Sequence, residues 1–120
     1  MQKTAPNKHL IWVELSKKSL LKNLQAFRSL LGQGTKLCPV VKSNAYGHGA
    51  FQAAGMIQDS KMAGWLAVNS VDEGLALRRQ GIKLPVLVLG YVPMGRLSDA
   101  VLHGLRLTVY NLETVRKLRS

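Results

Sequence analysis

Short apolar runs alternate with helix-like segments along most of this 120-residue chain. The strand-like runs begin near Lys36, Trp65, Val86 and Leu105, and a segment with helical spacing or a helix-capping residue follows each one. Alternation of this kind indicates right-handed β–α–β units around a parallel sheet. The pattern therefore predicts an α/β fold. By itself it leaves open both a doubly wound sheet and part of a (β/α)8 barrel.

The expected elements follow one another in the order strand, turn, helix. Expected strands cover residues 11–15, 36–42, 65–69, 86–89 and 105–110. Expected helices cover residues 17–31, 50–58, 71–80 and 93–103, with a terminal helix after Asn111.

Local signals mark several of these boundaries. Ser16 and Asn111 can cap helices, and residues 70–73 form a capping box. Pro39 lies inside an expected strand, where it removes a backbone donor and weakens pairing. No Gly-x-Gly-x-x-Gly motif follows the first strand, which argues against a dinucleotide-binding fold.

Composition excludes several classes of protein. A hydrophobic fraction of 47% is enough for a packed core, and no apolar run reaches the about eighteen residues of a membrane span. The polar start, residues 1–8, does not have the form of a secretory signal. Because Cys38 is the only cysteine, no intrachain disulfide can form, and a reducing cytoplasm is the expected setting.

The formal charge of +11 comes from 17 Lys and Arg residues against 6 acids. Such a balance raises the possibility of nucleic-acid binding. The basic residues are dispersed over several expected helices, however, and aromatic residues do not interleave with them as a stacking platform requires. We therefore interpret most of them as solvated helix faces and expect no specific nucleic-acid partner.

Residues 40–49 read Val-Val-Lys-Ser-Asn-Ala-Tyr-Gly-His-Gly and carry the main chemical signal. Lys42 ends an apolar run, and small residues that allow a tight turn follow it. Strand alternation predicts that Lys42 shares a face with Cys38 and Val40, which leaves room for a flat ring. A lysine in such a place can form a Schiff base with a carbonyl cofactor.

Residues 41–49 closely resemble the pyridoxal-phosphate (PLP) attachment motif of alanine racemases. Similar segments follow in the same order along nearly the whole chain, at residues 12–15, 66–68, 72–78 and 85–90. The resemblance implies the N-terminal part of a (β/α)8 TIM-type barrel, with about four of its eight strands. It further implies that residues 1–15 are an N-terminal strand segment belonging to the C-terminal β domain of the full enzyme, and that residues 16–120 are the partial barrel.

The resemblance also implies roles for individual residues. Lys42 would hold PLP and act as one of two catalytic bases, Tyr46 would contact the PLP phosphate, and Val40 and Leu89 would line the cofactor pocket. Ser43 stands where the family more often has alanine. The second base, a tyrosine of the partner subunit, has no counterpart in this sequence. The implied activity is interconversion of L- and D-alanine for peptidoglycan precursor supply, in a homodimer.

Plainer structural interpretations stand beside these roles. A strand-end lysine can extend into solvent, Tyr46 can pack on a neighbouring helix, and Val40 and Leu89 can be core residues. His48 more simply orients the loop, and the carboxylates in the capping box more simply stabilise a helix N-terminus.

Three functional hypotheses follow. The first is the N-terminal part of an alanine racemase, inactive as a 120-residue chain and, with half a barrel, marginally stable and prone to associate. The second is a broad-specificity or serine racemase of the same family. The third is a non-catalytic, truncated gene product with nonspecific affinity for polyanions.

Overall fold

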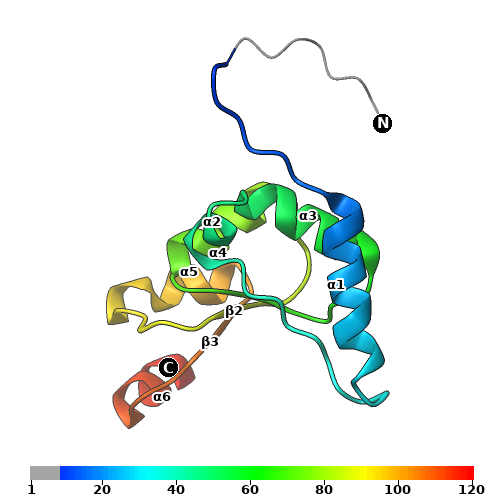
Figure 1. Ribbon diagram of the computed structural model, residues 1–120. Helices are drawn as coiled ribbons and strands as arrows, with labels where there is room; N and C mark the ends of the chain where they lie inside the picture. Colours follow the sequence, from blue (N-terminus) through cyan, green and yellow to red (C-terminus); the bar gives the residue numbers. More distant parts are fainter. Residues whose placement is uncertain (1–8) are drawn as a thin grey trace.

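A three-stranded parallel sheet forms the centre of the protein in a computed structural model that describes residues 9–120 (Figure 1). Its strands are β1 (Leu66–Val68), β2 (Val86–Val88) and β3 (Leu105–Leu107), and they lie side by side in the order of the sequence. Barrels add consecutive strands as neighbours in this way, whereas a doubly wound sheet reverses its order at a switch point. The expected N-terminal segment falls partly on residues 1–8, as does the polar start, and that part lies outside the described residues.

The expected strand over residues 36–42 is reduced to one bridge, in which Val40 pairs with Ala67 parallel to β1. Val41 donates its N–H to the Ala67 carbonyl at 2.8 Å, and Ala67 donates to the Pro39 carbonyl at 3.0 Å. One step earlier Trp65 donates to Leu37 at 3.3 Å, but the return bond would need an N–H on Pro39. The expected weakening of pairing at Pro39 is therefore confirmed. The prediction of a full strand was wrong for the same reason. This segment joins the sheet only through the pair of Val40 with Ala67.

The described part of the chain also contains seven helical segments. Their bounds are α1 (Lys17–Ser29), α2 (Lys42–Tyr46), α3 (Ala50–Ser60), α4 (Val71–Arg79), η1 (Met94–Arg96), α5 (Leu97–Leu102) and α6 (Leu112–Arg119). Caps predicted at Ser16 and Asn111 are confirmed, as is the capping box between Ser70 and Glu73. The segment after Pro93 begins as one 3-10 turn before the α-helix, a difference from the single helix expected there.

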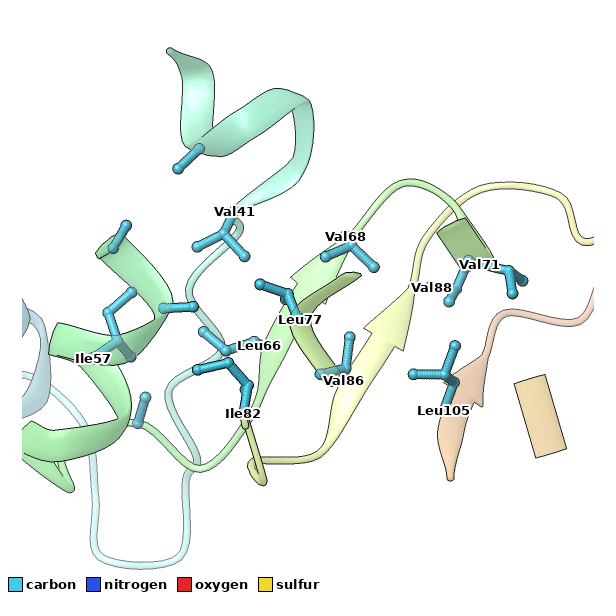
Figure 2. Packing of buried hydrophobic residues seen from close by; sticks show 14 of the residues in the cluster. Val41, Ile57, Leu66, Val68, Val71, Leu77, Ile82, Val86, Val88 and Leu105 are labelled. Carbon is cyan, nitrogen blue, oxygen red and sulfur yellow. The ribbon is translucent and has the colours of Figure 1, made fainter. Parts of the chain in front are cut away.

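The core lies between one face of the sheet and the helices (Figure 2). The side chains of Leu66 and Val68 from β1 and of Val86 and Val88 from β2 are at most 1% exposed. They pack with apolar residues of α3, α4 and α5, among them Ile57 from α3. Helices α1, α3, α4 and α5 contact one another in chain order and follow the outside of the sheet (Figure 1).

The other face of the sheet is open in the described chain. The strand register aligns Val40, Ala67, Leu87 and Arg106 in one row on this face. Val40 is 37% exposed, Leu87 is half-buried and Arg106 is exposed, although Ala67 itself is buried. In a closed barrel this face would be the interior, so the structure matches an incomplete barrel.

The strand expected over residues 11–15 is absent from the described structure, and this prediction was wrong for the chain as it stands. The segment is extended but has no strand partner, and Ile11 and Val13 are 87% and 69% exposed. Apolar alternation favours a strand only where a neighbouring strand offers hydrogen bonds. No helix among residues 9–120 is both long and apolar enough to cross a membrane.

Candidate active site

The carboxyl ends of the parallel strands meet at one edge of the sheet. Leu89 donates its N–H to the Val68 carbonyl at 2.8 Å, and Gly90 donates to the Asn69 carbonyl at 3.0 Å. Thr108 follows β3 and donates its hydroxyl to the Val88 carbonyl at 2.9 Å. This edge is where barrel enzymes place their reactive groups. Lys42 lies at the same edge, two residues after the strand bridge at Val40.

Lys42 begins a left-handed turn rather than a glycine turn. Ser43, Asn44, Ala45 and Tyr46 all have φ between 51° and 56°, in the left-handed region. The expected tight turn after Lys42 is present, but four residues that are not glycine form it before Gly47 is reached. This conformation costs about 1–2 kcal/mol for each L-residue, so contacts with the surrounding structure must stabilise the turn.

Strand geometry ends at Val41, where ψ is 20°. The alternation that was expected to put Lys42 on one face with Cys38 and Val40 therefore stops one residue before the lysine. What sets the place of Lys42 is the turn. A helical turn of either hand repeats after about 3.6 residues, so Tyr46 stands one turn after Lys42.

Hydrogen bonds within the motif hold the end of this turn. The side-chain oxygen of Asn44 accepts the Ala50 N–H at 2.9 Å, which caps α3, and its backbone carbonyl accepts the Gly49 N–H at 2.9 Å. A ring nitrogen of His48 lies 2.9 Å from the carbonyl oxygen of Ala45, whose side chain is buried. The predicted role of His48 in orienting the loop is confirmed.

Glu73 holds the beginning of the turn, a role that the sequence analysis missed. Its Oε1 accepts the Ser43 N–H at 2.7 Å, 30 positions away in the chain. Its Oε2 accepts the N–H groups of Asn69 at 2.6 Å and Ser70 at 3.2 Å. A capping box predicts the bond to Ser70 alone. The carboxylate thus joins the residue after Lys42 to the carboxyl end of β1.

Its neighbour Asp72 has a different role. The Asp72 carboxylate lies 2.6 Å from a guanidinium nitrogen of Arg96, which also contacts Asp99 at 2.9 Å. The hydrogen bond and charge of Arg96 lower the pKa of the Asp72 carboxyl, and both carboxylates raise the pKa of Arg96. This exposed ion pair joins the start of α4 to η1 and α5.

The four site residues predicted from the sequence differ in exposure. Lys42 and Leu89 are half-buried, Val40 is 37% exposed and Tyr46 is 61% exposed. More than half of Tyr46 is therefore left uncovered by its neighbours. By the strand register, Val40 and Leu89 both belong to the open face of the sheet.

Two hollows adjoin the turn on its helix side. One of about 450 Å³ lies between α1, α3 and the turn and is lined in part by Val40, Tyr46 and His48. The other, of about 410 Å³, lies between α3 and α4 and is lined in part by Asn44 and Glu73. Neither is lined by Lys42 or Leu89. Within residues 9–120, no three His, Cys, Asp or Glu side chains are grouped so as to hold a metal ion.

Comparison with known proteins identifies the family. The family model described as the alanine racemase N-terminal domain matches residues 15–120. The chain belongs to this family. Alanine racemase 1 of Oceanobacillus iheyensis is 39% identical over 108 residues, which cover 90% of this chain and 28% of that protein. The chain thus spans a little over a quarter of the length of this curated relative.

Solved structures agree with the alanine racemase fold. A crystal structure of alanine racemase from Bacillus anthracis with bound L-Ala-P superposes with a TM-score of 0.85 at 34% identity, covering 94% of this chain and 29% of that one. A histidine racemase from Leuconostoc mesenteroides gives a TM-score of 0.76 at 25% identity, covering 87% and 27%. The prediction of a partial α/β barrel from the N-terminal portion of an alanine racemase is confirmed.

Proposed function

We propose that this chain is the N-terminal part of a PLP-dependent alanine racemase and that Lys42 is its cofactor lysine. The observation that carries the proposal is the place of Lys42, half-buried at the carboxyl edge of the sheet, with the Tyr46 phenol one turn later. The reaction would interconvert L- and D-alanine for peptidoglycan precursors, in a cytoplasmic homodimer. Residues 1–15 would join the β domain of the whole protein.

The side chains around Lys42 have the chemistry that PLP requires. Lys42 supplies a primary amine that can hold the cofactor aldehyde, and the exposed Tyr46 phenol can donate a hydrogen bond to a phosphate. Val40 and Leu89 supply apolar surface on the open face of the sheet. When bound, PLP provides an electron sink for a carbanion at the substrate α-carbon.

Lys42 would have two tasks in this reaction. Its amine would hold the cofactor in the resting state, and once substrate has displaced it, the freed amine would move a proton at one face of the α-carbon. A second base must serve the opposite face, and residues 9–120 offer no side chain that we assign to it. The isolated 120-residue chain is therefore expected not to racemise alanine. Racemisation by this chain that vanishes in Lys42→Ala would overturn that expectation.

A chimera tests the proposal. Residues 15–120 would replace the matching segment of the Oceanobacillus iheyensis relative, and the chimera would be expressed in a bacterial strain that requires D-alanine. We expect growth without D-alanine from the parent chimera and from a Lys36→Ala control, because Lys36 is exposed on the segment leading to the site. Lys42→Ala should abolish growth. Equal growth of both variants would contradict the assignment of Lys42.

A broader amino-acid racemase is the second candidate, and the structural likeness to a histidine racemase favours it. The two candidates share Lys42 and Tyr46 and differ only in the substrates accepted. Assays of the whole protein on L-alanine, L-serine and L-histidine separate them. Conversion of alanine alone supports the first candidate, and comparable conversion of the larger substrates supports the second.

A further inference from the structure

We propose that Glu73 is a positioning residue, whose carboxylate fixes the left-handed turn that carries Lys42 and Tyr46. The inference rests on the proposed function, in which Lys42 is the cofactor lysine. It adds a residue that lies on another helix and that would act through the backbone of Ser43.

The geometry exceeds what a helix cap needs. A capping box requires one carboxylate oxygen on the N-cap N–H, which Glu73 provides through Oε2 to Ser70 at 3.2 Å. The shorter bonds go elsewhere, from Ser43 to Oε1 at 2.7 Å and from Asn69 to Oε2 at 2.6 Å. Both are charge-assisted and within the range of strong hydrogen bonds. The two shortest hydrogen bonds of this side chain are therefore made to the site edge and not to the N-cap of the helix.

The bond between Glu73 and Ser43 lies where it can fix the direction of the Lys42 side chain. Ser43 is the first residue with left-handed geometry, and its N–H belongs to the peptide that links it to Lys42. Fixing that peptide against the end of β1 sets the direction in which the Lys42 side chain leaves the backbone. The other end of the turn is held separately by Asn44 and His48.

Two variants separate positioning from capping. Glu73→Gln keeps one carbonyl oxygen but replaces the other with an NH2 group, which cannot accept an N–H, so it cannot serve Ser43 and Asn69 together. Ser70→Ala removes the opposite half of the same capping box, the Ser70 hydroxyl that accepts the Glu73 N–H at 3.3 Å. It leaves the Ser43 bond in place and is the matched control. Asp72→Asn controls for the loss of one charge in the same helical turn.

The experiment measures two quantities on the full 120-residue chain. The first is the rate of amide hydrogen exchange at Ser43, read by NMR. The second is the share of Lys42 among PLP adducts trapped with borohydride and located by peptide mapping. Glu73→Gln should raise Ser43 exchange about tenfold or more and lower the Lys42 share toward that of an average surface lysine. Ser70→Ala and Asp72→Asn should leave both near the parent values.

The outcomes are distinct. Equal effects of Glu73→Gln and Ser70→Ala on Ser43 exchange and Lys42 share would overturn the proposal and reduce Glu73 to a cap. If Glu73→Gln does not fold, Glu73→Asp replaces it, because aspartate keeps the carboxylate on a side chain that is shorter by one methylene. Unchanged Ser43 exchange in Glu73→Asp would also overturn the proposal. Faster Ser43 exchange in Glu73→Gln, with no Lys42 preference in the parent chain, would support the role of Glu73 in fixing the turn and contradict an organised cofactor site on this chain.

Discussion

Gly90 approaches Asn69 so closely that no side chain fits between them. Its N–H donates to the Asn69 carbonyl oxygen at 3.0 Å, and a Cβ on Gly90 would lie 2.5 Å from that same oxygen. The contact holds the chain after β2 against the chain after β1, at the edge where Lys42 stands. The glycine here is required by space, since its φ lies outside the left-handed region.

We expect Gly90→Ala to lower the free energy of unfolding by about 1–3 kcal/mol, because backbone must shift to admit the methyl group. Gly95→Ala is the control, since its Cβ would meet nothing within 4 Å. That variant should be neutral or more stable by up to about 1 kcal/mol. Urea unfolding followed by circular dichroism measures both, and equal effects would refute the close approach.

Arg78 fixes two loops at the opposite edge of the sheet. Its Nη1 donates to the carbonyls of Ile82 and Leu84, each at 2.8 Å, and its Nε donates to that of His103 at 3.0 Å. Burial, and then the charge of Arg106, lower the pKa of this guanidinium. A lysine would keep the charge but could not direct donors at both loops.

Arg78→Lys should therefore cost about 1–2 kcal/mol of unfolding free energy, because two partly buried carbonyls and one exposed carbonyl lose a charged donor. Arg79→Lys, on the exposed neighbour, should change it by no more than about 0.5 kcal/mol. Thermal or urea unfolding compares the two variants. Similar losses would show that the Arg78 contacts add nothing beyond charge.

The lowered pKa of Asp72 determines how the stability that the ion pair contributes depends on pH. The hydrogen bond and charge of Arg96 lower the pKa of Asp72 in the folded chain, so the folded state binds this proton less readily than the unfolded state. The stabilisation is present above the ordinary carboxyl pKa and is lost as pH falls through the lowered one. Because the pair is exposed, salt should weaken it.

NMR titration of the Asp72 carboxyl carbon measures this effect. Arg96→Gln should raise the midpoint toward the ordinary carboxyl value, and Arg79→Gln should raise it less, since Arg79 contributes only a weaker charge interaction. A midpoint that does not respond to Arg96→Gln would contradict the ion pair.

Much of the fold could be predicted from the sequence because its signals are local. The caps at Ser16, Ser70 and Asn111 depend on a residue and its next three neighbours, and β2 is an apolar run without polar interruption. The strand over residues 11–15 could not be judged in this way. A strand forms only with a partner, and the described chain offers none beside it.

The site could be predicted only in part. The resemblance around Lys42 pointed to this lysine and to Tyr46; Lys42 lies at the expected edge, and Tyr46 follows one helical turn later. The left-handed turn was missed because Ser, Ala and Tyr have no intrinsic preference for positive φ; only Asn44 carries such a signal. The link from Glu73 to Ser43 was missed because a capping box explains the glutamate locally, while its second oxygen bonds a residue 30 positions away.

The location of the PLP adduct on the chain tests the assignment of Lys42 most directly. The purified 120-residue chain would be incubated with PLP, reduced with borohydride and mapped by mass spectrometry, with Lys42→Ala as control. We expect one dominant adduct at Lys42, absent from the variant, while the exposed Lys36 reacts no more than other surface lysines. Adducts spread evenly over the surface lysines, unchanged by Lys42→Ala, would contradict an organised cofactor site on this chain.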